Sequence, residues 1–317
     1  MTSYIARRIL YIIPTLILLS LVVFAMLEFA PGDPLSAVIR PGASISDATI
    51  EAYKEKFGLD KPIHMRFISW LSQIFQGNLG LSVVTFRPVT EMIGEKLYPT
   101  LLLTFSALLI SLLVGIPIGI LSAVKRYSFV DYFTTFFAFL GISMPNFFFG
   151  LLAIYIFSTQ LDLLPFGGMT SYGAGNYTAD LLQHLILPSL ALGVPFIATI
   201  VRFLRSSIIE HLNADYTRTA YSKGLSPAKV LGKHVLRNSL TSTITIITTQ
   251  LPLLMGGAVV IETVFSWPGM GLLLKHSIYA RDYPVIMGFV LIVAVFVIIS
   301  NLLADIAYAS LDPRIRY

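Results

Sequence analysis

Six long stretches without a charged side chain dominate this sequence and limit what it can fold into. They run roughly over residues 9–27, 101–124, 132–160, 185–201, 238–261 and 283–304. About 18 such residues are enough for a helix to cross about 30 Å of hydrocarbon. Hydrophobic residues make up 56% of the 317 residues and charged residues only 12%, a balance outside the range of soluble domains. We therefore predict an all-α membrane protein with six transmembrane helices.

The first apolar stretch follows Arg7 and Arg8, a pattern that also begins secretory signal peptides. It is longer than a typical signal core, and residues 28–34 offer no small-residue cleavage pattern, so we expect a retained helix. The fourth stretch is short and the third is long, and for these two we expect tilt, a kink or shifted helix ends. The chain has no cysteine, which excludes disulfides and thiolate metal ligands.

The basic residues between the apolar stretches predict orientation. Thirteen of the 22 lysines and arginines belong to one set of helix ends, at 7–8, 125–126, 202–237 and 314–316, whereas the short connections on the other side hold only Lys275 and Arg281. The remaining seven lie in the long segment 31–99, where seven acids balance them. We therefore expect both termini in the cytoplasm. The net charge of +5 then reflects topology, and nothing in it argues for nucleic-acid binding.

The segment 31–99 contains apolar residues at helical spacing. The three predicted helices carry Ile50, Tyr53 and Phe57 before Gly58; Ile63, Phe67, Trp70, Leu71 and Ile74 before Gly77; and Val89, Met92 and Ile93 after Pro88. Glycine can end a helix in the left-handed conformation, and proline suits a first helical turn. We expect a small extracytoplasmic helical segment that either packs over the bundle or docks an external partner.

The basic loop 202–237 contains residues that end one helix and start another. Residues 215–223 favour a helix that Gly224 would end, Ser226 is a strong N-cap, and Pro227 suits the first turn of the next helix. In that second helix Ala228, Leu231 and Val235 would share an apolar face, while Lys229, Lys233 and Arg237 would share a basic one. Charge alone would suit a solvated loop that only enforces topology. The added turn residues favour a docking element presented to the cytosol.

Arg218, Thr219 and Ala220, followed after three residues by Gly224, resemble the E-A-A-x-x-x-G signature loop of membrane subunits of binding-protein-dependent ABC importers. In that family the loop forms a coupling helix that fits a cleft on the ATP-hydrolysing subunit. Arg218 and Thr219 depart from the general signature, and the later I-x-L-P motif reads H-V-L-R at 234–237. The R-T-A-x-x-K-G-L form is instead typical of the dipeptide, oligopeptide and nickel permease branch.

Further matches to this branch span nearly the whole chain. They are A-P-G-D-P at 30–34, G-L-D-K-P at 58–62, G-N-L-G-L-S at 77–82, E-T-V-F-S-W-P-G-M-G at 262–271, R-D-Y-P at 281–284 and L-D-P-R-I-R-Y at 311–317. Asn78 stands where we expect Asp. The chain thus resembles the first, B-type, permease subunit of a peptide importer. Closely similar permeases handle nickel chelates, glutathione and opines, so these substrates remain alternatives.

The resemblance implies a type I ABC importer transmembrane fold in the cytoplasmic (inner) membrane of a bacterium or archaeon. It also implies a second homologous permease subunit, two ATP-binding subunits that carry ATP and Mg²⁺, an extracytoplasmic substrate-binding protein and contact with membrane lipid. The expected ATPase contacts are Asp215, Ala220, Lys223, Gly224, Leu225, Ser226 and Pro227. We divide the chain into a first transmembrane helix (1–30), the extracytoplasmic segment (31–99), a transmembrane core (100–308) and a cytoplasmic tail (309–317).

Glycines and prolines interrupt several apolar stretches, and in lipid the freed backbone groups need protein or a water-lined cavity. Most of these interruptions suit ordinary kinks. As candidate pathway residues we select those where polar groups coincide with breaks: Ser143, Met144, Pro145, Asn146 and Gln250. Glu262 is assigned to positioning the outer gate segment 265–271, the alternative being an interfacial acid that meets water.

Glu28, Glu262 and Asp305 are the acids that we place nearest the apolar stretches, all at helix ends. A proton relay needs acids near helix centres, which argues against a proton-coupled secondary transporter, the main rival class. The sequence has no G-x-x-x-x-G-K-[ST] phosphate loop, so we expect no cofactor in this chain. Scattered histidines give no metal-site spacing, and no nucleophile motif supports an intramembrane enzyme, the second rival class.

Overall fold

The computed structural model describes residues 2–29, 51–52, 54–55 and 60–311. Within these residues the regular structure is helical, apart from one antiparallel bridge between Leu81 and Pro88. The all-α prediction is therefore confirmed. The chain forms two compact units, one from residues 1–100 and 268–298 and the other from residues 101–267 and 299–317.

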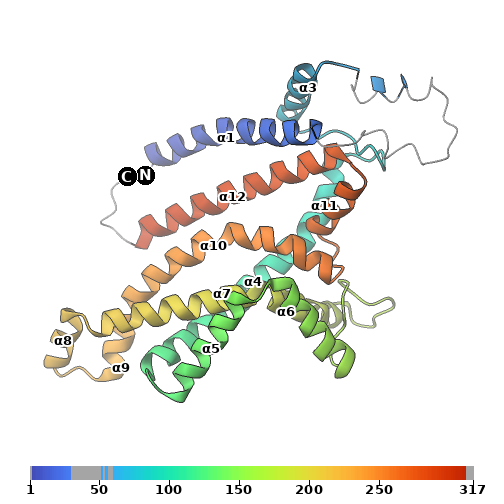
Figure 1. The fold of residues 1–317 in the computed structure, drawn as a ribbon. Coiled ribbons are helices and arrows are strands. Elements are labelled where there is room, and N and C mark those ends of the chain that lie inside the picture. The colour runs from blue at the N-terminus through green and yellow to red at the C-terminus, as the bar shows by residue number, and fades with distance from the viewer. Residues whose placement is uncertain (1, 30–50, 53, 56–59, 312–317) are drawn as a thin grey trace. The chain divides into compact units, whose positions relative to one another are not determined.

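Among the described residues, five helices are long and apolar enough to cross a membrane, and a sixth span results if a bent pair of helices crosses as one (Figure 1). The five are α1 (Thr2–Glu28), α4 (Val89–Val124), α7 (Tyr177–Leu212), α10 (Leu236–Val264) and α12 (Tyr283–Leu311). The bent pair joins α5 (Phe129–Ser143) to α6 (Asn146–Ala153) and its π-helical continuation η2 (Ile154–Gln160). Each of the six predicted stretches lies within one of these helices or within the bent pair.

The helices α5 and α6 of the third span are bent by 110° relative to each other. Proline disfavours helical geometry in the residue before it, and Met144, which precedes Pro145, is extended with φ −89° and ψ 134°. Pro145 then occupies the N-cap of α6. The kink expected in the overlong third stretch is thus present, and its cause is the Met144-Pro145 step.

Several helices extend beyond the apolar stretches that predict them. The fourth stretch, 185–201, lies inside the 36-residue helix α7. The separate short helix expected after Pro88 is wrong, because Val89, Met92 and Ile93 belong to the first turns of α4. Charged residues end an apolar stretch but have good helix propensity, so they need not end the helix.

In the unit of residues 1–100 and 268–298, α3 (Ile63–Phe75) packs against the end of α1. Arg66 Nη1 lies 2.8 Å from Glu28 Oε1, and the rings of Phe67 and Phe24 are 5.4 Å apart. Gly77 follows α3 with φ 76°, as expected for a glycine that ends a helix. The helix predicted around Ile50, Tyr53 and Phe57 lies outside the continuously described residues.

The loop before α4 contacts the turn between α11 (Met270–Tyr279) and α12 in the same unit. Ser82 Oγ donates to Asp282 Oδ2 at 2.5 Å, and Val83 N donates to Asp282 Oδ1 at 3.2 Å. Two motifs that are distant in sequence, G-N-L-G-L-S and R-D-Y-P, therefore meet in space. Asn78 accepts a bond from Gly80 N at 2.9 Å, a turn contact that an aspartate carboxylate could also make.

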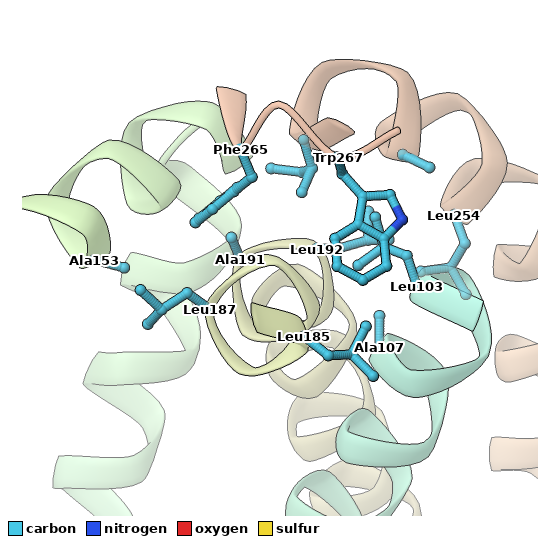
Figure 2. Packing of buried hydrophobic residues seen from close by; sticks show 12 residues of the cluster. Leu103, Ala107, Ala153, Leu185, Leu187, Ala191, Leu192, Leu254, Phe265 and Trp267 are labelled. Atoms are coloured by element: carbon cyan, nitrogen blue, oxygen red, sulfur yellow. The ribbon is translucent and has the colours of Figure 1, made fainter. Parts of the chain in front are cut away.

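In the unit of residues 101–267 and 299–317, α7 is central to the apolar core. Figure 2 shows Ala191 of α7 beside Phe265 and Leu192 of α7 beside Trp267, and both aromatic side chains enter from the segment after α10. A Cβ on Gly193 would lie 3.1 Å from the Ala107 carbonyl oxygen and 2.9 Å from Ser111 Oγ. This glycine therefore allows close packing of α7 on α4, a use of small residues that is common between membrane helices.

Candidate functional site

The central part of the predicted coupling loop 202–237 is residues 215–236, here called the coupling segment, and it has the expected helix–turn–helix form. Helix α8 (Asp215–Ser222) is followed by Gly224 with φ 77°, and α9 (Pro227–Val230) begins after the N-cap residue Ser226. A Cβ on Gly224 would meet no atom within 4 Å, so the glycine is required for its backbone conformation and not for space. The Ser226 hydroxyl makes no capping hydrogen bond, which leaves Pro227 as the helix-start signal.

The coupling segment is anchored by a buried apolar cluster. Ala220, Val230 and Val235 of the segment pack with other buried side chains, which are Ala123 of α4 and Leu204 and Ile208 of α7. Figure 1 shows α8 and α9 between the C-terminal end of α7 and the start of α10. Motion of the segment would therefore act directly on α4 and α7.

The expected apolar face of the second helix is partly wrong. Val230 and Val235 are fully buried, Leu231 is half-buried and Ala228 is exposed. After one α-helical turn the chain enters a π-helical stretch, η3 (Leu231–Val235), whose wider turn shifts the register of the side chains. The basic face is present, because Lys229, Lys233 and Arg237 are all exposed.

Thr217 is a functional-segment residue that sequence reasoning missed. It is fully buried, and its Oγ1 donates to the His211 carbonyl oxygen at 2.7 Å. The Tyr216 hydroxyl also lies 2.7 Å from His211 Nδ1. These bonds fix α8 against the end of α7. A lone threonine in a basic loop carries no signal for such a role.

The predicted ATPase-contact residues divide by exposure. Asp215, Lys223, Gly224, Ser226 and Pro227 are exposed. Leu225 is half-buried and Ala220 is buried, so these two belong at least partly to the anchor. The segment therefore presents a polar outer face on an apolar base.

Four of the predicted pathway residues gather at the α5–α6 break. Ser143 and Pro145 are exposed, whereas Met144 and Asn146 are half-buried. The Asn146 Nδ2 atom lies 3.5 Å from the place where a Cβ on Gly257 would stand, so α6 approaches α10 there.

Gln250, the fifth predicted pathway residue, is half-buried on α10. It lies two helical turns before Gly257, about 10 Å along the axis. The approach of α6 to α10 at Asn146 therefore lies away from Gln250.

Glu262 lies near the end of α10 and its side chain is fully buried. The alternative of an interfacial acid that meets water is therefore wrong for this structure. Its carbonyl oxygen accepts from Trp267 N at 2.8 Å, and Gly168 N donates to the Phe265 carbonyl oxygen at 2.8 Å. Phe265 and Trp267 are nearly or fully buried, so the start of the predicted gate segment is held in the core.

A buried acid that sequence reasoning missed lies at the start of α5. Asp131 is 2% exposed, and Arg205 of α7 donates to it through Nε at 2.6 Å and Nη2 at 2.8 Å. Ser122 Oγ and Tyr127 N also donate to this carboxylate. Asp131 directly precedes the apolar stretch 132–160 and follows the N-cap Ser128, so in the sequence it looks like an ordinary first-turn acid.

Within the described part of the chain, no group of three or more histidine, cysteine, aspartate or glutamate side chains could hold a metal ion. The site consists of a docking segment, a buried ion pair and a broken helix. These parts can transmit movement.

Comparison with known proteins agrees with this arrangement. Residues 115–317 match the family described as binding-protein-dependent transport system inner membrane component, and residues 1–104 match the N-terminal family of the same membrane components.

Two curated relatives are similar over their whole length. A putative peptide permease protein of Brucella suis biovar 1 is 44% identical over 317 residues, covering 100% of this chain and 99% of the relative. The glutathione transport system permease protein GsiC of Escherichia coli O6:H1 is 40% identical over 317 residues, covering 100% of both chains.

Among solved structures, the MetNI methionine ABC transporter in inward-facing conformations matches with a TM-score of 0.56. It is 16% identical, over 70% of this chain and 96% of that chain, so it bears on the fold alone. The shared fold is that of a type I importer transmembrane subunit, as expected from the sequence.

Proposed function

Because the chain belongs to the family of binding-protein-dependent transport system inner membrane components, we propose that it is a permease subunit that imports peptides at the expense of ATP. It is a multi-pass protein of the cytoplasmic membrane. The peptide substrate is supported by the peptide permease relative at 44% identity. Glutathione, the substrate named for the relative at 40% identity, is itself a small peptide and stays within this proposal.

The observation that carries the proposal is the anchored coupling segment. Its outer face is exposed and basic, and its inner face is packed against α4 and α7. A surface loop that only set topology would not need three fully buried anchor side chains, Thr217, Val230 and Val235. A rigid segment that receives force from another protein does need such an anchor.

The proposed assembly contains a second permease subunit, two ATP-binding subunits and an extracytoplasmic binding protein. ATP and Mg²⁺ would bind to the ATP-binding subunits, since this chain has no phosphate loop. With the basic loops in the cytoplasm, the coupling segment faces the ATP-binding subunits and the segment 31–99 faces the binding protein.

The mechanism requires no bond chemistry in this chain. The binding protein delivers a peptide to the outer face, and the ATP-binding subunits close when they bind ATP. Their closure moves the coupling segment as a rigid body, and its buried anchor carries α4 and α7 along. The core helices then change the side from which the pathway is open, which is alternating access.

The first test is the composition of the complex purified in mild detergent. We expect a second permease chain and two ATP-binding subunits, and ATP-dependent peptide uptake after reconstitution with the binding protein. Uptake by this chain alone, driven by a proton gradient, would contradict the proposal and favour a secondary transporter. Competition of labelled peptide uptake by glutathione, a nickel chelate or an opine would identify the substrate class.

The second test is Gly224→Val in the reconstituted complex. A β-branched residue at φ 77° is strained by about 1–3 kcal/mol, so the turn between α8 and α9 should distort. We expect ATP hydrolysis to continue while peptide uptake per ATP falls. Normal uptake with the segment still folded would refute the coupling role.

Gly173→Val is the matched control. Gly173 also has a positive φ, 75°, and a Cβ there would meet no atom within 4 Å. It lies outside the coupling segment, so the backbone strain is similar but the coupling should be unaffected.

A further inference from the structure

We propose that the Asp131–Arg205 ion pair makes α5 move with the coupling segment, so that both residues position the pathway during transport. The inference rests on the proposed function, because it assigns a role within the same transport cycle. Its starting observation is that Asp131 joins three parts of one compact unit: the end of α4, the start of α5 and α7.

The Asp131–Arg205 pair has the geometry of a specific, bidentate ion pair. Two nitrogens of one guanidinium reach the two oxygens of one carboxylate, at 2.6 Å and 2.8 Å. Such a two-pronged contact fixes direction as well as distance. Ser122 Oγ adds a hydrogen bond to Oδ1 at 2.6 Å, and Tyr127 N adds one to Oδ2 at 3.0 Å.

Burial makes the connection hard to break. Asp131 is 2% exposed, and a buried carboxylate without its partner is strongly disfavoured. Tyr127, whose amide binds this carboxylate, has φ 62°, an unusual conformation for a residue with a side chain. The carboxylate therefore also holds the strained turn between α4 and α5.

The same turn of α7 contacts the coupling segment. Leu204, next to Arg205, and Ile208, one turn further on, are fully buried with Val230 and Val235 of the segment. On α4, Ser122 binds Asp131 and the adjacent Ala123 packs in the same apolar cluster. On both α4 and α7, residues that pack against the coupling segment are therefore direct neighbours of residues that bind Asp131.

This arrangement has a mechanical consequence. The coupling segment, the end of α4 and the end of α7 form one block, and α5 is fastened to that block through Asp131. At its other end α5 reaches the break at Met144-Pro145, where four predicted pathway residues lie. Ala138 of α5 also packs on Ala198 and Val201 of α7, and the ion pair adds a directional connection next to the coupling segment. Loss of the pair should therefore weaken the transfer of movement from the coupling segment to the break.

The main experiment measures coupling in the complete complex in proteoliposomes, with Asp131→Asn and Arg205→Gln. Both ATP hydrolysis, stimulated by binding protein and peptide, and peptide uptake are measured per folded complex. We expect hydrolysis to persist, because the coupling segment keeps its apolar anchor, and uptake per ATP to fall about tenfold. Arg87→Gln is the control, since it breaks the Arg87–Glu95 pair, in which both side chains are about half exposed.

A purely structural pair would give a different result. It would lower the yield or thermal stability of the complex and leave uptake per ATP unchanged, and that outcome would overturn the inference. Ser122→Ala provides a milder variant that removes one bond to Asp131 and leaves Arg205 in place. We expect a smaller loss of uptake per ATP in this variant, and unchanged coupling in it would also count against the inference.

A distance measured between α5 and α9 distinguishes a positioning role of the ion pair from a purely stabilising one. The chain has no cysteine, so spin labels can be attached at Phe129→Cys on α5 and Lys229→Cys on α9, both at exposed positions, with partner cysteines removed. If α5 and the segment move as one block, the label distance stays constant when ATP binds. When Asp131→Asn is added to the same doubly labelled protein, the distance should change or broaden on ATP binding, and an unchanged narrow distance would refute the connection.

The two levels of hypothesis fail in different ways. If the unmodified complex shows no ATP-dependent uptake, the proposed function fails. If the unmodified complex transports peptide and the Asp131 and Arg205 variants keep normal coupling, only the role of the ion pair fails.

Discussion

Ser82 Oγ lies 2.5 Å from Asp282 Oδ2 and connects residues 200 positions apart in the chain. Both side chains are buried in the unit of residues 1–100 and 268–298. Ser82 Oγ also accepts from Thr85 N at 2.9 Å. The serine therefore closes its own turn and binds the acid before α12. This contact holds the loop before α4 against the turn between α11 and α12.

Replacement of Ser82 by alanine should destabilise this unit. The change removes a donor to a buried carboxylate, and an unsatisfied buried group of this kind costs about 1–3 kcal/mol. We expect a lower thermal unfolding midpoint in detergent. Ser69→Ala, at an exposed position of α3 in the same unit, is the control and should leave the midpoint unchanged. Equal midpoints for the two variants would show that the Ser82 bond contributes nothing.

The stability of the same unit should depend on pH through Asp282. Burial raises the pKa of Asp282, although bonds from Ser82 and Val83 act in the opposite direction. An acid whose pKa is raised on folding contributes stability that is complete below its unfolded pKa, which is about 3.9. That contribution is lost as the pH rises through the higher folded value.

The check is a thermal unfolding series from about pH 4 upward, comparing the native chain with Asp282→Asn. The native chain should lose stability relative to the asparagine variant as the pH increases. A constant difference would mean that Asp282 has the same pKa in the folded and unfolded chains. A difference of opposite sign would mean that its bonds outweigh its burial.

Close packing between α4 and α7 provides a third prediction, for Gly193→Ala. The new Cβ would lie 3.1 Å from the Ala107 carbonyl oxygen and 2.9 Å from Ser111 Oγ, so a backbone atom as well as a side chain must shift. Overpacking of this kind costs about 1–3 kcal/mol. A lower unfolding midpoint is expected, whereas Gly175→Ala, where a Cβ meets no atom within 4 Å, should be neutral. Matching midpoints would indicate that the helices separate without cost.

The spans could be predicted from the sequence because a helix that crosses a membrane consists of consecutive, mostly apolar residues. The ends of the helices could not, because α4 and α7 continue through charged turns that favour helix as much as apolar residues do. The turn at Gly224 was also predictable, since a single residue type serves its backbone conformation.

Most of the features that the sequence did not predict are contacts between residues that are far apart in the chain. Asp131 looks like a common first-turn acid, and its partner Arg205 lies 74 residues away. The motifs around Ser82 and Asp282 are each visible in the sequence, but one sequence contains no information that they touch. The exposed position of Ala228 follows from the π-helical turn η3, which ordinary helical spacing does not anticipate.

Glu262 provides the last prediction, which also separates the proposed importer from a proton-coupled carrier. Its side chain is fully buried near the end of α10, and its carbonyl oxygen binds Trp267 N. If Glu262 acts by filling space and positioning the segment after α10, Glu262→Gln should keep ATP-driven uptake, because the amide has nearly the same shape. Glu262→Ala should lower stability by about 2–4 kcal/mol, because it leaves a cavity where a fully buried side chain stood. Loss of uptake in the glutamine variant at unchanged stability would instead require a titrating carboxyl, as in a proton relay.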